Sequence, residues 1–147
     1  MELEFRRVDV GKELRRLRDF DRRVFPKADL FPASFWRAAE VYWMLVDDKR
    51  VGCCALQDEL EADGVLAISS TGILPAWQGI GLGRVMKAWQ IAYARRHGYN
   101  RVVTETRAGN ERMIRLNQSF GFRIVRTTPG CYVDPEEAAV EMELWLR

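Results

Sequence analysis

A glycine-rich turn between an apolar strand and an amphipathic helix constrains this chain more than any other segment. Gly79, Gly81 and Gly83 stand at every second position where the strand is joined to the helix, and the strand stops at Pro75. Glycine adopts positive φ, so successive backbone N–H groups can converge on phosphate oxygens at the positive end of a helix dipole. We therefore expect this turn to bind a diphosphate, and the alternative is a purely structural turn.

The positions of the glycines exclude two other phosphate-binding motifs. A dinucleotide motif G-x-G-x-x-G needs a third glycine where this chain has Arg84 or Met86. The P-loop pattern G-x-x-x-x-G-K-[ST] is absent from the sequence as well. Neither a dinucleotide-binding turn nor a P-loop is expected.

Size and composition indicate one globular domain over residues 1–147. Apolar residues make up 48% of the chain and charged residues 30%, which is an ordinary globular balance. The formal charge of +2 is small, and basic residues are interspersed with acidic ones. Nucleic acid is therefore not an expected partner.

No membrane segment or leader is expected. The sequence lacks a run of roughly 18 apolar residues that could span a bilayer. The segment Met1–Arg7 lacks the apolar core of a signal peptide. These features predict a cytoplasmic location and no membrane partner.

Cysteine and histidine usage removes several classes of enzyme. Cys53, Cys54 and Cys131 form neither a disulfide framework nor a C-x-x-C motif, and we expect reduced thiols. His97 is the one histidine of the sequence. Most Ser–His hydrolases and multi-histidine zinc enzymes are therefore excluded, and no metal is expected.

Apolar periodicity predicts alternating strands and helices. After the glycine turn, Leu82, Met86 and Trp89 share one helix face, while Lys87 and Gln90 are expected to point away from it. Strands are expected over about 3–8, 41–46, 51–56, 65–74, 101–106, 122–128 and 140–146, and helices over about 14–20, 34–39, 82–97 and 110–120. This order implies an α/β domain on a mixed sheet.

Two blocks of the sequence resemble a known enzyme superfamily. The pattern Gln78-x-x-Gly81-x-Gly83 resembles the acyl-coenzyme A binding motif of the Gcn5-related N-acetyltransferases. Downstream, the run from Glu105 to Asn110, followed by a short helix that ends in Gly-Phe, resembles the second cofactor-contacting block of that superfamily. The resemblance covers about residues 65–125.

Within the superfamily, the chain looks most like the branch that acetylates the N-terminal alanine of a ribosomal protein. The similarity lies in the Glu-x-Arg-x-x-Asn run, the Phe25-Pro26 bend and the position of Tyr132 before Pro135. The implied fold is a mixed, mostly antiparallel sheet of about seven strands flanked by about four helices. The implied activity is transfer of an acetyl group from acetyl-CoA to a primary amine.

The resemblance also implies which residues bind the cofactor. The end of the strand would offer backbone groups to the pantetheine arm, the turn would wrap the pyrophosphate, and an asparagine would bond the amide chain. A plain helix cap is the alternative for that asparagine. The implied set is Thr71, Gly72, Ile73, Gln78, Gly79, Ile80, Gly81, Leu82, Gly83, Arg84 and Asn110.

Glu105 is the expected general base. It lies near the end of a predicted central strand. The resemblance to the N-terminal alanine branch implies that the base glutamate of that branch stands at this position. Proton transfer through a positioned base or a relaying water typically contributes about 10²–10⁴ in rate. The alternative is a structural glutamate paired with Arg101 or Arg107.

The general acid is harder to assign. The superfamily usually has a tyrosine seven residues after the cofactor asparagine, and this chain has Asn117 there. A coenzyme A thiol with a pKa of about 8.5 is a tolerable leaving group, so an acid would be helpful without being obligatory. Asn117 could stabilise the sulfur, or Tyr132 could reach it from the loop before the last strand.

The acceptor and the partners remain open at this stage. The amine could belong to a small molecule or to a protein N-terminus, and a half-exposed final strand with Trp145 could pair with a second subunit. Two other classes of function are a non-catalytic acyl-CoA sensor and an interaction module. The module would use Trp36, Tyr42 and Trp43 as a contact surface.

Overall fold

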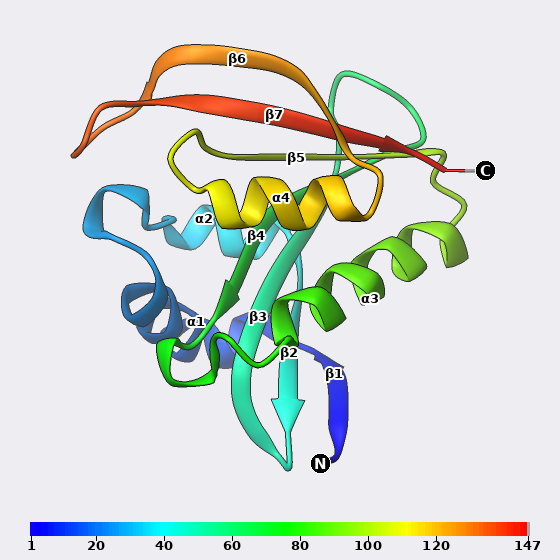
Figure 1. The fold of residues 1–147 in the computed structure, drawn as a ribbon. Coiled ribbons are helices and arrows are strands. Elements are labelled where there is room, and N and C mark those ends of the chain that lie inside the picture. The colour runs from blue at the N-terminus through cyan, green and yellow to red at the C-terminus, as the bar shows by residue number, and fades with distance from the viewer. Residues whose placement is uncertain (147) are drawn as a thin grey trace. The chain divides into compact units, whose positions relative to one another are not determined.

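The computed structural model describes residues 1–146, which form strands and helices in the predicted order (Figure 1). The elements are β1 (Leu3–Arg7), α1 (Val10–Val24), η1 (Lys27–Asp29), α2 (Ala33–Ala38), β2 (Glu40–Val46), β3 (Lys49–Asp58), β4 (Val65–Ile73), η2 (Pro75–Trp77), α3 (Leu82–Arg96), β5 (Arg101–Arg107), α4 (Glu111–Ser119), β6 (Arg123–Tyr132) and β7 (Glu137–Trp145). The labels η1 and η2 denote short 3-10 helices.

The strands form a seven-stranded sheet within residues 1–146, in the order β1-β2-β3-β4-β5-β7-β6. β4 and β5 pair in parallel, whereas the pairs β1–β2, β2–β3, β5–β7 and β6–β7 are antiparallel. The predicted α/β class, with a mixed and mostly antiparallel sheet, is confirmed.

The chain divides into two compact units. One comprises Met1–Gln57 with Ser69–Met86, and the other comprises Asp58–Ile68 with the chain from Lys87 onward. β4 and α3 each contribute a segment to both units.

The first unit packs α1 and α2 against one face of β2 and β3. Its core is aromatic, with the Phe20 and Trp43 rings edge-on at a centroid distance of 5.6 Å and Phe31 stacked on Phe35 at 3.7 Å. Trp36 and Trp43 are 2% and 1% exposed. The contact surface that the interaction-module alternative assigned to these two tryptophans is therefore wrong, because both rings are core residues.

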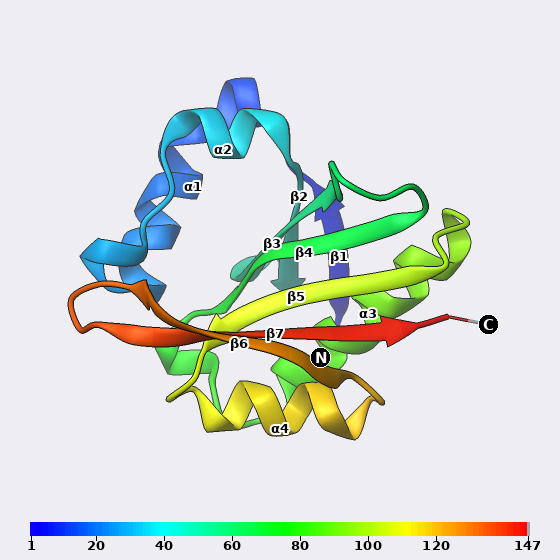
Figure 2. The ribbon, with the colours of Figure 1, turned by 90° about the horizontal axis from the view of Figure 1, so that it is seen from above.

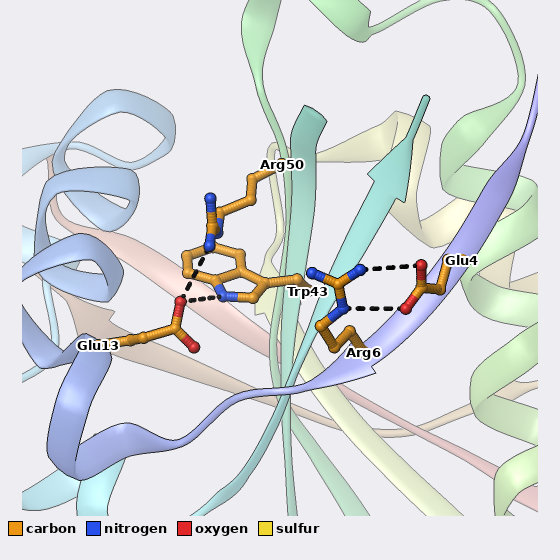
Figure 3. A network of polar contacts seen from close by, with 5 residues as sticks. All are labelled: Glu4, Arg6, Glu13, Trp43 and Arg50. Carbon is orange, nitrogen blue, oxygen red and sulfur yellow. Dashed lines mark hydrogen bonds and ion pairs between the residues drawn. The ribbon is translucent and has the colours of Figure 1, made fainter. Parts of the chain in front are cut away.

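A carboxylate on α1 ties that helix to the sheet (Figure 3). Glu13 Oε1 accepts hydrogen bonds from Trp43 Nε1 at 3.3 Å and from Arg50 Nη2 at 3.2 Å. The Arg50 guanidinium lies 5.5 Å from the centroid of the Trp43 ring. Figure 3 also shows the separate pair of Arg6 with Glu4 on β1, in which Arg6 donates from Nε at 2.9 Å. The Glu13 contacts fix the rotation of α1 on the strands.

The hairpin between β2 and β3 closes on two residues with positive φ. Asp47 has φ 48° and Asp48 has φ 66°. Two-residue hairpin turns of this kind require positive φ at both positions. The Asp47 side chain accepts a hydrogen bond from the N–H of Glu2 at 2.8 Å, which joins the turn to the start of β1. Two aspartates thus occupy the positive-φ positions of the turn, where glycine is more usual.

The second unit places β7 between β5 and β6, with α4 along the strands (Figure 2). Val102, Val140 and Met142 supply buried side chains. The last strand was expected to be half-exposed and able to pair with a second subunit, but in this sheet β6 occupies the edge position beside β7. Trp145 is 55% exposed, but its ring lies against the Arg101 guanidinium at 4.9 Å and its Nε1 donates to Glu143 at 3.2 Å.

Two polar residues of α3 are buried, although the periodicity predicted them outside. Lys87 is 1% exposed and Gln90 is fully buried, whereas Val85 is 39% exposed. The Lys87 ammonium lies 5.6 Å from the centroid of the Phe122 ring, so its charge is placed over an aromatic face. The buried residues of α3 form one broad face that is rotated from the predicted apolar stripe: Leu82, Met86, Lys87, Gln90, Ile91, Tyr93 and Ala94. Over residues 1–146, no helix combines the length and apolar character needed to cross a membrane.

Candidate functional site

The glycine turn of the first unit has the backbone conformation that the sequence predicted. Gly79 has φ 82° and Gly81 has φ 92°, both in the region where residues with a Cβ are strained. A Cβ added at either position would meet no heavy atom within 4 Å. Glycine is therefore required here by conformation rather than by crowding, and the space next to the turn is open for a ligand.

The turn leads directly into α3. The helix begins at Leu82, and the N–H of Val85 donates to Gly81 O at 3.2 Å. The first N–H groups of an α-helix point along its axis, and they carry the positive end of the helix dipole. This arrangement suits an anion with several oxygens.

Gln78 holds the other end of the turn. Its Nε2 donates to the carbonyl of Ile73 at 2.9 Å, which joins the turn to the last residue of β4. The side chain of Gln78 is thus engaged in shaping the loop. The motif glutamine therefore has a structural reason in this chain that is independent of any ligand.

Thr71, Gly72 and Ile73 end β4 as predicted. A Cβ at Gly72 would lie 3.0 Å from Val24 Cγ1 and 3.2 Å from Phe25 Cε2. Glycine at this position lets the strand approach the end of α1 closely. No pattern of neighbouring residues predicts this contact, because it depends on packing between distant segments.

In the second unit, the structure brings Glu105 and Tyr132 together. Tyr132 Oη donates to Glu105 Oε1 at 3.1 Å, although the residues lie 27 positions apart. Arg101 and Arg107 instead form ion pairs with Glu143 at 3.0 Å and with Glu137 at 3.1 Å. The expected alternative, a structural pairing of Glu105 with one of these arginines, is not among the contacts of the described residues. Glu105 is exposed at the end of β5.

Asn110 caps α4, as its position before the helix predicted. Its Oδ1 accepts a hydrogen bond from the N–H of Met113 at 3.2 Å. The Asn110 side chain is exposed. The cap uses the side-chain oxygen, so the amide N–H₂ is the part of this residue that suits a cofactor carbonyl.

Asn117 faces the interior of the second unit. It is 1% exposed, and its Nδ2 lies 3.6 Å from the sulfur of Met142, to which it donates. The Asn117 carbonyl also accepts the N–H groups of Phe120 and Phe122 at the end of α4. This placement is that of a residue that organises a helix terminus, and it does not favour Asn117 as a donor to a thiolate.

A buried carboxylate lies beside the proline-containing bend after α1. Asp21 is 2% exposed, and its Oδ2 accepts a hydrogen bond from the N–H of Phe31 at 3.0 Å. Burial raises the pKa of Asp21, with partial opposition from the Phe31 hydrogen bond and the charge of Arg22. Among residues 1–146, no cluster of His, Cys, Asp and Glu could hold a metal ion.

Comparisons with known proteins agree with this geometry. The sequence model of the acetyltransferase (GNAT) family matches residues 11–122. No curated protein matches the chain in a sequence search. Among solved structures, the ribosomal-protein-S18-alanine N-acetyltransferase of Escherichia coli has a TM-score of 0.84 at 19% identity, over 98% of this chain and 94% of that chain.

Two further structures carry ligands related to coenzyme A. Arabidopsis thaliana Naa50 in complex with the bisubstrate analogue CoA-Ac-MVNAL has a TM-score of 0.86 at 19% identity, over 99% of this chain and 100% of that chain. A GNAT family acetyltransferase from Elizabethkingia anophelis with acetyl-CoA bound has a TM-score of 0.83 at 17% identity, over 98% of each chain. At these identities the structures show the fold. The family match covers most of the sequence, and the chain therefore belongs to the GNAT family of acetyltransferases.

Proposed function

We propose that this chain transfers an acetyl group from acetyl-CoA to a primary amine by direct attack while both substrates are bound. The family membership makes it an N-acetyltransferase. The observation that carries the choice of cofactor is the pair of positive-φ glycines, Gly79 and Gly81, at the open N-terminus of α3. Related folds with coenzyme A or acetyl-CoA bound support the same choice.

The turn would hold the pyrophosphate through backbone amides between Gly79 and Arg84. A diphosphate carries two negative charges, and charge-assisted hydrogen bonds from N–H groups suit it. The end of β4 at Thr71–Ile73 would pair with the pantetheine arm as an added strand does. Asn110 would donate its amide N–H to the arm while its oxygen keeps the helix cap.

Glu105 would accept the proton that the attacking amine releases. The amine nitrogen forms a bond to the thioester carbon, the carbon–sulfur bond breaks, and the thiolate leaves with the electron pair. An α-amine with a pKa near 8 is deprotonated to roughly a tenth at neutral pH, whereas a lysine side chain near 10.4 is deprotonated to well under 1%. The exposed Glu105 carboxylate, bonded to Tyr132, is suited to take that proton through water.

Tyr132 is favoured over Asn117 as the group that could protonate the thiolate. The Tyr132 hydroxyl is a donor, and it is already directed at the proposed base. Asn117 is buried with its amide on a sulfur of the core. The acid assignment therefore rests on Tyr132, and Asn117 is proposed to hold the end of α4.

The remaining parts of the proposal concern partners and organisation. The acceptor is a primary amine on a small molecule or on a protein N-terminus. The chain works as one domain in the cytoplasm, without a nucleic-acid or membrane partner, and a homodimer is compatible with it. The composition and the lack of long apolar runs in the sequence support these parts of the proposal.

An NMR titration with coenzyme A and an acetyl-transfer screen test the proposal together. Binding should shift the amide resonances of residues 79–84, and Gly81→Glu should abolish those shifts because it adds strain and a like charge. The screen uses acetyl-CoA with N-terminal peptides, polyamines and aminoglycosides. Unmoved amides would refute the cofactor site. Binding without transfer to any amine would show a sensor rather than an enzyme.

A further inference from the structure

The Arg107 guanidinium donates hydrogen bonds to several residues near the start of β7. Its side chain is 15% exposed, and its Nη1 donates to Pro135 O at 2.8 Å and to Glu137 Oε1 at 3.1 Å. Its Nη2 donates to Val133 O at 2.8 Å. One guanidinium thus engages two residues between β6 and β7 and the first residue of β7, and we call residues 133–137 the β6–β7 turn.

The same guanidinium also lies over an aromatic ring. The Arg107 carbon Cζ is 4.6 Å from the centroid of the Tyr132 ring. Tyr132 immediately precedes the β6–β7 turn, and its hydroxyl reaches Glu105 at 3.1 Å. Arg107 therefore touches both the ring and the backbone that carry this hydroxyl.

Strand geometry places Arg107 and Glu105 on the same side of β5. Residues two apart on a strand point to the same face, so both side chains leave β5 on the side of the β6–β7 turn. Glu137 draws the guanidinium toward the turn, and the Glu137 carboxylate also accepts the N–H of Gly109. The Glu105 carboxylate is left to Tyr132.

Other charged groups near Glu105 are already paired. Glu141 on β7 is its direct partner in the β5–β7 register, and Glu141 forms an ion pair of 2.7 Å with Arg126. Within the described residues, the Tyr132 hydroxyl is the hydrogen-bond donor to Glu105. The orientation of this donor depends on the β6–β7 turn that Arg107 holds.

We propose that Arg107 is a positioning residue that fixes the β6–β7 turn and thereby keeps the Tyr132 hydroxyl on the Glu105 carboxylate. The inference rests on the proposed acetyl transfer and adds a residue to it. The planar fork of arginine can donate to two carbonyls and a carboxylate while it stacks on a ring, and the ammonium of lysine cannot reproduce this geometry.

The first experiment is Arg107→Lys, which keeps the charge and removes the fork. We expect kcat to fall about 10-fold to 100-fold, as small misplacements of catalytic groups do, with an unchanged KM for acetyl-CoA. Arg123→Lys is the matched control. Arg123 lies on the edge strand β6 and pairs with Glu143 of β7. The Arg123→Lys variant should leave kcat unchanged.

A double-mutant cycle separates positioning from a general loss of structure. If Arg107 acts through the Tyr132 hydroxyl, Arg107→Lys should cost little further activity in a Tyr132→Phe background. Equal losses in both backgrounds would overturn the proposal, as would an unchanged kcat in Arg107→Lys. Glu137→Gln is the second variant, for use if Arg107→Lys unfolds, and it should show the same non-additivity.

A label on Cys131 reports on the turn without any activity. Cys131 is exposed and adjacent to Tyr132, whereas Cys53 and Cys54 are buried, so a trifluoromethyl thiol reagent should label Cys131 selectively. The fluorine resonance should shift or broaden in Arg107→Lys and stay as in the parent in Arg123→Lys. An unchanged resonance in Arg107→Lys would contradict the clamp even if the parent transferred no acetyl group, so the two proposals can fail separately.

Discussion

The glycine turn before α3 and the end of β5 are built in opposite ways. The turn relies on backbone, since Gly79 and Gly81 adopt positive φ with nothing near their Cα hydrogens. The end of β5 relies on side chains, since Glu105 and Tyr132 meet across 27 positions of sequence. The first arrangement can bind an anion of fixed shape, and the second can move a proton.

This difference implies that the two regions can be impaired independently. A change in the turn should alter the affinity for coenzyme A and leave the chemistry of the bound complex intact. A change at the end of β5 should do the reverse. The predictions below test that separation.

The largest effect is expected from Glu105→Gln. The glutamine keeps the size of the side chain and can still accept from Tyr132, but it cannot take a proton from the amine. We expect kcat to fall by about 10²–10⁴ while the dissociation constant of coenzyme A stays the same. Steady-state kinetics and calorimetry measure the two quantities. Full activity in this variant would remove Glu105 from the mechanism.

Gly81→Ala should have the next largest effect, on affinity alone. The strained φ should displace at least one amide that faces the pyrophosphate, and a hydrogen bond to a charged group contributes about 1.5–3 kcal/mol, or roughly 10-fold to 100-fold in affinity. At saturating acetyl-CoA, kcat should approach that of the parent.

Gly98→Ala is the matched control for Gly81→Ala. Gly98 follows α3 with φ 77°, and a Cβ there would also meet no heavy atom within 4 Å. Both alanines should lower the free energy of unfolding by about 1–2 kcal/mol. If Gly98→Ala weakens coenzyme A binding as much as Gly81→Ala does, strain rather than local contact explains the loss.

Asn110 offers a smaller test, because its cap and its proposed cofactor bond use different atoms. Asn110→Ala should lose the bond from Met113 N and about 1 kcal/mol of stability. Asn110→Asp keeps an oxygen for the cap but removes the N–H₂ group, so it should retain stability and bind coenzyme A several-fold more weakly. Chemical denaturation and calorimetry on both variants separate the roles. Unchanged affinity in Asn110→Asp would leave Asn110 as a cap alone.

The smallest effects concern two carboxylates with opposite pKa shifts, one in each unit. Burial raises the pKa of Asp21, so its contribution to stability is full below pH 3.8 and is lost as pH rises through the folded-state pKa. For Glu143, burial opposes the charge, but hydrogen bonds from Arg101, Trp145 and Arg123 outweigh it and lower the pKa. Its contribution is present above pH 4.5 and is lost as pH falls below that value.

Denaturant titrations between pH 3 and pH 7 check both signs. Relative to the parent, Asp21→Asn should gain stability with rising pH, whereas Glu143→Gln should lose it. Slopes of the same sign for both variants would contradict the assigned causes.

Much of the fold could be predicted because its signals are local. The glycines before α3, the Asn110 cap and the strand periodicities each depend on neighbours in sequence, and all three agree with the structure. The burial of Lys87 and Gln90 could not be predicted in this way. The buried face of α3 is rotated from the apolar stripe that the periodicity marks, and tertiary packing sets that rotation.

The candidate site divides along the same line. The backbone turn follows from residue types at fixed spacing. The hydrogen bond between Tyr132 and Glu105 and the contacts of Arg107 depend on the register of β5, β6 and β7. The β6–β7 register shifts between Ile124 and Arg126 and between Thr128 and Tyr132. Such irregularities re-aim side chains, and no local pattern in this sequence marks them. The burial of Asn117 likewise follows from the packing of α4 on Met142.

The hairpin turn at Asp47 and Asp48 has a practical consequence for anyone who engineers this enzyme. Asp48 adopts φ 66° without a glycine, so a replacement by glycine relieves a left-handed conformation that costs roughly 1–2 kcal/mol, less the chain entropy that glycine adds when unfolded. Asp47 should be kept, because its carboxylate holds the N–H of Glu2. A more heat-tolerant starting point for directed evolution is thus available at a residue remote in sequence from every proposed site position.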